Sequence, residues 1–169
     1  MKKAILAALL MTIFFFPPTG FGAEHRLGGG TNYWVTLDDI TDSDDNGIDD
    51  DGFSFIASYQ YRAGLLGFEA DLELLPDRFG ETAIAPQAYI LLGKAIYVAA
   101  GIGVVYSDDE FADEPFFGLR GGFDMEILPG IYADIYANYR FNDRASLDNE
   151  DTDIDTDTVF LGAMVRLSL

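Results

Sequence analysis

An acidic stretch, DSDDNGIDDDGF at residues 42–53, has side chains that could bind a cation. In a calcium loop, carboxylates at alternate positions and one backbone carbonyl converge on the ion, and a glycine allows the sharp turn. The candidate ligands in that spacing are Asp42, Asp44, Asn46, the carbonyl of Ile48, and Asp50. Phe53 stands where an EF-hand has a bidentate glutamate. A solvated, mutually repulsive loop tip is the alternative, and both interpretations stay open.

Residues for covalent or zinc catalysis are scarce in the chain. His25 is the single histidine and there is no cysteine. A serine nucleophile needs an adjacent base, and catalytic zinc is held mainly by histidine and cysteine. We therefore expect that the protein is not an enzyme and that it has no cofactor, calcium being the one candidate.

Another set of charged residues shares the polar face of segments in which apolar and polar residues alternate. In 67–74, for example, three acids alternate with Phe68, Ala70, Leu72 and Leu74. The set contains Arg62, Glu69, Asp71, Glu73, Arg120, Asp124, Glu126, Asp134, Arg140 and Arg166. We expect these side chains to face one enclosed space, where unpaired charges are costly and ion pairs are favoured.

Alternation with a period of two is the signal of a β-strand, and no sustained helical period competes with it here. It predicts eight strands, at residues 27–37, 52–62, 67–74, 83–92, 95–106, 116–127, 131–141 and 159–169. The connections between them alternate strictly between long and short. The long ones, at 38–51, 76–82, 107–115 and 142–157, hold 22 of the 29 acidic residues. The pattern predicts an antiparallel up-and-down barrel with long acidic loops at one end.

The first 23 residues have the layout of a secretory signal peptide. Lys2 and Lys3 precede an apolar run at 4–16, which is followed by Pro17, Pro18 and small residues. That run is shorter than the ~20 residues that a membrane-spanning helix requires. We expect cleavage near Ala23, leaving an exported single domain at 24–169. Only eight scattered Lys and Arg would remain, against 29 Asp and Glu, which argues against nucleic acid as a partner.

Strand length, loop asymmetry and the polar face together separate two kinds of barrel. Strands of 8–12 residues match the ~9–11 that cross a bilayer, and the polar face carries almost no lysine, unlike a solvated surface. A soluble lipocalin-like barrel is the alternative. The layout resembles the small OmpA/OmpX-type barrels of the Gram-negative outer membrane over the whole mature chain. That resemblance implies an eight-stranded transmembrane barrel, although Leu169 stands where the family usually ends in an aromatic residue.

The resemblance is architectural and does not specify a function. We expect a structural or surface-interaction role, in which the acidic loops meet divalent cations, lipopolysaccharide or host surfaces. One alternative is a narrow, porin-like channel or carrier for small solutes or cations, with a path lined by Glu69, Asp71 and Glu73 and supported by an excess of six inward acids over four inward arginines. A weaker alternative is a lipid-modifying enzyme. An ion-paired plug is favoured over a path, and Arg62 is expected opposite Glu69 across the hairpin at 64–67.

Overall fold

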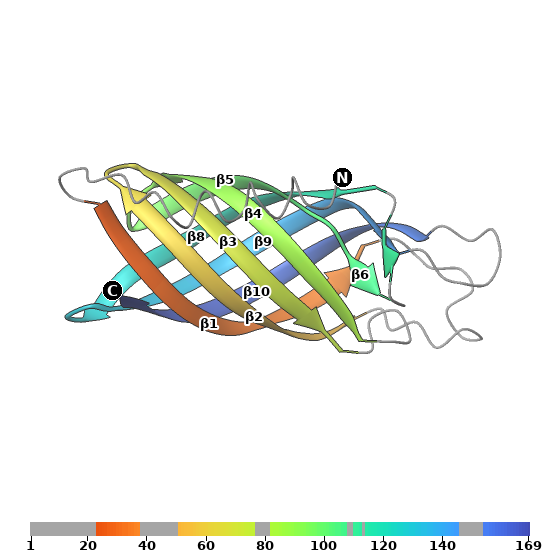
Figure 1. The fold of residues 1–169 in the computed structure, drawn as a ribbon, viewed down its shortest axis with the longest axis horizontal. Helices are drawn as coiled ribbons and strands as arrows, with labels where there is room; N and C mark the ends of the chain where they lie inside the picture. The colour runs from red at the N-terminus through yellow and green to blue at the C-terminus, as the bar shows by residue number, and fades with distance from the viewer. Residues whose placement is uncertain (1–22, 38–50, 77–81, 108–109, 113, 146–153) are drawn as a thin grey trace.

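The computed structural model describes residues 23–37, 51–76, 82–107, 110–112, 114–145 and 154–169. Eight long strands make up the barrel (Figure 1): β1 (Ala23–Thr36), β2 (Asp51–Ala63), β3 (Leu66–Leu75), β4 (Ala83–Gly93), β5 (Ile96–Gly103), β8 (Phe116–Leu128), β9 (Ile131–Ala145) and β10 (Ile154–Ser168). Two short strands, β6 (Tyr106–Ser107) and β7 (Glu110–Phe111), lie at the end that carries the long connections. In the described part of the chain, no helix has the length and apolar character needed to cross a membrane.

Each long strand pairs antiparallel with its neighbours in sequence, and the pairing of the first strand with the last closes the barrel. β1 pairs with β10 from Arg26–Ser168 to Thr36–Thr158, and β3 pairs with β4 from Leu66–Leu92 to Leu75–Ala83. Closure leaves none of the eight long strands as an open edge strand, which is the condition for a sheet to span a bilayer. The predicted all-β, eight-stranded antiparallel barrel is confirmed.

The faces of the barrel follow the alternation of the sequence. Outward side chains are apolar and exposed, for example Ile135 (64%) and Phe53 (63%), while the polar positions between them are buried. Inward glycines leave room for large neighbours. A Cβ on Gly162 would lie 2.2 Å from both Asn32 Oδ1 and Tyr136 Cζ. The barrel is therefore polar inside and apolar outside, the reverse of a lipocalin-like barrel.

The strand predicted at 95–106 is interrupted in the structure. Regular pairing between β4 and β5 ends at Gln87–Gly103, next to Pro86. Proline has no N–H to donate to a ladder, so it favours an irregularity at that point. The strand direction resumes at β6, where Tyr106 pairs with Ile84, and β6 and β7 form a small hairpin. Part of the predicted loop at 107–115 is therefore strand.

The last long connection is also shorter than predicted, because β9 extends to Ala145 and β10 begins at Ile154. A register shift interrupts the ladder between Thr156 and Thr158. Bulges of this kind add one residue to one strand and disturb the ladder locally. The extra residue lies on β9, because three steps there, from Asp143 to Arg140, oppose two steps on β10, from Thr156 to Thr158.

The β2–β3 hairpin turns more tightly than we expected. Ala63 pairs with Leu66, so the turn contains only Gly64 and Leu65, and Gly64 has a positive φ of 66°. Gly can adopt that conformation without a steric cost. The tighter turn shifts the register, and Glu69 faces Gln60 while Arg62 faces Gly67. The expected pairing of Arg62 with Glu69 is wrong.

Candidate functional site

The interior holds equal numbers of buried cations and carboxylates among the described residues. Nine of the ten charged residues expected there are buried: Arg62, Glu69, Asp71, Glu73, Arg120, Asp124, Asp134, Arg140 and Arg166. Arg26 joins them, giving five arginines and five acids. Glu126 does not. Its side chain is exposed beside the turn after β8 and accepts a hydrogen bond from Gly130 N at 2.9 Å. Its expected interior position is wrong because β8 has no β5 partner beyond Phe123 and pairs only with β9 at Glu126.

Arg26 is not among the predicted interior charges because the first strand was expected to begin at residue 27. β1 begins at Ala23, and Arg26 has the same inward phase as Asn32 and Trp34. The three glycines at 28–30 carry no side-chain signal and hide this alternation. Arg26 precedes Trp34 by eight residues, an even number, so a strand extended back from Trp34 would have placed Arg26 on the same inward face.

The interior at the loop end is closed by apolar side chains, which we call the apolar plug. Its buried members are Trp34, Leu75, Ala83, Ala85, Val105, Phe116 and Phe160. Beneath it, Arg140 pairs with Glu73, and its guanidinium lies over the rings of Phe160 (3.8 Å) and Phe116 (4.7 Å). Glu73 also accepts hydrogen bonds from Asn32, Ser54 and Gln87.

A second group of ion pairs occupies the middle of the barrel. Glu69 accepts from Arg120 at 2.5 Å and from Arg166 at 2.8 Å. Arg120 also pairs with Asp71 at 3.1 Å, and Arg166 pairs with Asp134 at 2.7 Å. The Arg120 guanidinium lies between two aromatic rings, those of Tyr89 (4.0 Å) and Tyr136 (4.4 Å). These contacts compensate for much of the desolvation of the charges.

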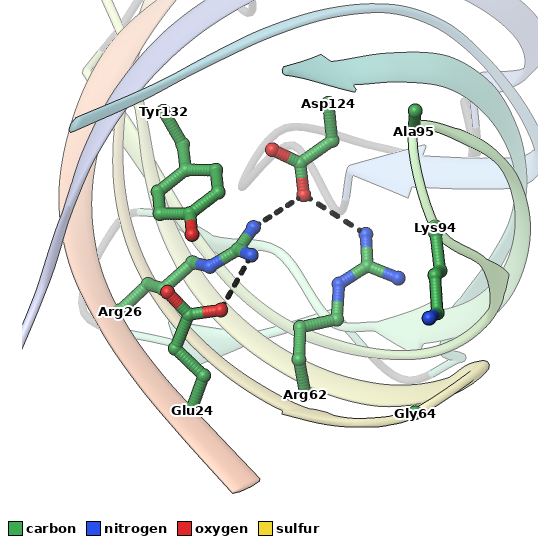
Figure 2. A pocket seen from close by; sticks show the side chains of 8 residues that line it. All are labelled: Glu24, Arg26, Arg62, Gly64, Lys94, Ala95, Asp124 and Tyr132. Carbon is green, nitrogen blue, oxygen red and sulfur yellow. Dashed lines mark hydrogen bonds and ion pairs between the residues drawn. The ribbon is translucent and has the colours of Figure 1, made fainter. Parts of the chain in front are cut away.

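A third group lies at the short-turn end around Asp124. Its Oδ2 atom accepts from Arg26 at 2.7 Å and from Arg62 at 3.1 Å. Arg26 also pairs with Glu24 at 2.7 Å and lies 3.4 Å over the centre of the Tyr132 ring. Figure 2 shows these residues around a cavity of about 300 Å³. We call this cavity the vestibule.

Glu24 lies at the mouth of the vestibule, next to the start of the described chain and outside the membrane-spanning part of β1. Partial burial acts to raise its pKa, but hydrogen bonds and the charge of Arg26 outweigh that effect and hold the pKa below its usual value. Glu24 is therefore ionised at neutral pH and neutralises part of the charge of Arg26.

The calcium ligands proposed from the sequence, Asp42, Asp44, Asn46, Ile48 and Asp50, lie outside the described residues, as does the predicted signal peptide up to residue 22. Within the described part of the chain, no three His, Cys, Asp or Glu side chains are grouped so that they could hold a metal ion. His25 Nδ1 lies 2.6 Å from Tyr59 Oη, and its ring contacts that of Tyr61.

Two outward-facing carboxylates lie at the loop-end rim, and each accepts a hydrogen bond from a tyrosine. Tyr33 donates to Asp51 at 2.6 Å, and Tyr139 donates to Asp157 at 2.5 Å. Leu37 N also donates to Asp157 O at 2.9 Å, so the end of β1 lies against β10 at this rim. The connection between β1 and β2 carries the candidate calcium loop, and it therefore begins beside Asp157 and ends at Asp51.

Comparisons with known proteins identify the fold. No protein-family profile matches the chain, and neither does any curated protein. Among solved structures, Neisserial surface protein A is 15% identical, with a TM-score of 0.64, over 88% of this chain and 99% of that one. Outer membrane protein AlkL, solved in lipid bilayers, is 11% identical, with a TM-score of 0.52, over 91% and 95%. The chain therefore has the fold of the small eight-stranded outer-membrane β-barrels.

Proposed function

We propose that this protein is a non-conducting outer-membrane barrel whose function is carried by its long acidic loops, which meet divalent cations, lipopolysaccharide or host surfaces. The filled interior is the observation that carries the proposal. The apolar plug lies at the loop end, and three groups of ion pairs lie beneath it. A barrel of eight strands has space for its own side chains and little more. The surface at the loop end then remains as the place for interactions.

The charge balance of the interior supports a closed, ion-paired interior over a path for cations. A path for cations needs an excess of carboxylates, and the predicted interior set had such an excess, with six acids against four arginines. With Arg26 inside and Glu126 outside, the buried charges among the described residues are balanced at five arginines and five acids. Ion pairs of this kind fix side chains in place, and a mobile cation would have to break them.

A catalytic role has little support from the described residues, and we propose that the protein is not an enzyme. The one histidine bonds to Tyr59, and its ring contacts that of Tyr61. Ser54, on the inner face, is fully buried and donates a hydrogen bond to Glu73, which is ion-paired with Arg140. A serine enzyme instead needs an accessible hydroxyl oxygen beside a base that is free to take its proton.

Single-channel recording in planar bilayers tests whether the filled interior blocks conduction. We expect no steady conductance from the wild-type monomer. Phe160→Ala, which removes a ring from the apolar plug, should give transient openings because Phe160 packs against Arg140. Leu161→Ala changes an outward, 57% exposed side chain on the same strand and should behave as the wild type. Stable ohmic channels from wild-type monomers would contradict the proposal and support the channel or carrier.

Calorimetric titration with calcium tests the role of the first acidic loop. We expect the wild type to bind with a dissociation constant on the order of 10⁻⁴–10⁻³ M, as exposed extracellular sites do. Asp42→Ala/Asp44→Ala should abolish this binding, because it removes two ligands at alternate positions. Glu126→Ala, at the opposite end of the barrel, is the matched control and should bind as the wild type. Equal binding by all three proteins would show that the loop is only a diffuse acidic tip.

Repeating the titration with lipopolysaccharide in the bilayer tests whether the ion also recruits that lipid.

A further inference from the structure

The vestibule is accessible from one side only. The short turns lie at its end of the barrel (Figure 1), and outer-membrane barrels place short turns in the periplasm. The opposite end is closed by the apolar plug and by the ion pairs beneath it. A molecule that enters the vestibule must therefore come from the periplasm or from the inner leaflet of the membrane.

The lining of the vestibule carries one more positive than negative charge. The cations are Arg26, Arg62 and Lys94, and the acids are Glu24 and Asp124. The whole chain has a formal charge of −19. That negative charge is concentrated in loops at the other end, beyond an apolar band ~25 Å tall, and charges are screened over about 8 Å at physiological salt. The vestibule is therefore a locally basic site in a strongly acidic protein.

The surplus charge belongs to Lys94. Both acids of the lining are already bonded to arginine, Glu24 to Arg26 and Asp124 to Arg26 and Arg62. Lys94 is the single lysine of the described residues and makes no ion pair or hydrogen bond there. Arg26 Nε is a donor buried in the same wall without a hydrogen-bond partner. Polar groups in such a position favour a bound ligand or ordered water.

The turn that carries Lys94 is fixed from three sides. Arg62 Nη1 donates to Gly93 O at 2.9 Å, and Asp124 N donates to Ala95 O at 2.8 Å. Gly93 N donates to Leu65 O at 2.8 Å, which links this turn to the β2–β3 turn. Figure 2 shows Lys94 and Arg62 on the same side of the vestibule. A held backbone lowers the entropic cost of binding, so the lysine is partly pre-organised.

We propose that the vestibule is a periplasmic binding site for a singly charged oxyanion group, a carboxylate or a phosphodiester, with Lys94 as its charge partner. One negative charge neutralises the surplus, whereas a doubly charged phosphate would leave an uncompensated negative charge. A volume of about 300 Å³ limits the ligand to a small molecule or one lipid headgroup. The bearer of the oxyanion is either a soluble periplasmic carboxylate or an anionic lipid of the inner leaflet.

Amide chemical shifts of the full barrel in lipid nanodiscs test the proposal and separate the two sources. In nanodiscs of phosphatidylcholine, N-acetylglycine is the soluble probe. In the other arm, phosphatidylglycerol is added to the nanodisc without a soluble anion. We expect saturable shifts at Gly64, Lys94 and Ala95 in at least one arm. With N-acetylglycine, the dissociation constant should be on the order of 1–10 mM, because a single partly exposed ion pair contributes little.

Lys94→Gln should weaken binding at least tenfold, and Lys94→Arg should retain it. Glu126→Gln changes the charge at the same end without lining the vestibule, and its Oε1 can still accept from Gly130 N, so it is the matched control. Saturation with N-acetylglycine assigns a soluble carboxylate, and saturation with phosphatidylglycerol assigns a lipid headgroup. The proposal is overturned if neither probe saturates by ~100 mM or its lipid equivalent. It is also overturned if Lys94→Gln binds as the wild type, or if Glu126→Gln changes binding as much as Lys94→Gln does.

Discussion

Arg120→Ala is expected to lower the free energy of unfolding by ~3–5 kcal/mol, the usual effect of removing one partner from a buried ion pair. Arg120 pairs with Glu69 and with Asp71, and all three side chains are almost fully buried. The substitution leaves Asp71 without its arginine, while Glu69 keeps Arg166. It also removes a cation from between the rings of Tyr89 and Tyr136. Urea unfolding of the barrel in lipid vesicles measures the change.

Two further variants separate the lost ion pairs from the lost volume of the side chain. Lys94→Ala removes an exposed cation and should change stability little, because exposed charges contribute about 0–1 kcal/mol. Arg120→Ala combined with Asp71→Asn should be less destabilising than the two single changes added together, because the double variant leaves no unpaired charge. Strict additivity would contradict the assignment of Arg120 and Asp71 as a coupled pair.

Ile135→Arg is expected to cost ~2–4 kcal/mol, the range for arginine on the lipid face near the middle of the bilayer. Ile135 is 64% exposed, points away from the interior and pairs with Phe123 and Ala163, which are also outward. The charge would lie in hydrocarbon with no carboxylate to pair with. The free energy of unfolding in vesicles, measured by tryptophan fluorescence, gives the cost.

The matching change on the inner face is Asn138→Ser. Asn138 is buried and donates to Tyr89 Oη at 3.0 Å, so the loss should be about one hydrogen bond, ~1 kcal/mol. Ile135→Leu keeps the outward face apolar and should be close to neutral. If Asn138→Ser were more damaging than Ile135→Arg, the outer surface would be solvated and the lipid-facing assignment would fail.

The sequence by itself determined the architecture of this protein. Strict alternation can be satisfied in only one phase, because a shift by one residue would move every apolar side chain to the polar face. That rule placed the interior charges of β3, Glu69, Asp71 and Glu73, and the outward Ile135. The alternation rule fails where residues have no side chain. The glycines at 28–30 interrupt the alternation, so the inward position of Arg26 could not be predicted from it. At Pro86 a missing N–H contributed to an irregularity that alternation cannot show.

Tertiary structure alone decided which charges meet. Ion pairs such as Arg26 with Asp124, or Arg166 with Glu69, join residues 98 and 97 positions apart. Their partners depend on barrel closure and on the register of each hairpin, and a turn of two residues at Gly64 was enough to separate Arg62 from Glu69. The vestibule has the same origin. Its lining comes from four strands and two turns, and they meet only because β1 pairs with β10 and closes the ring.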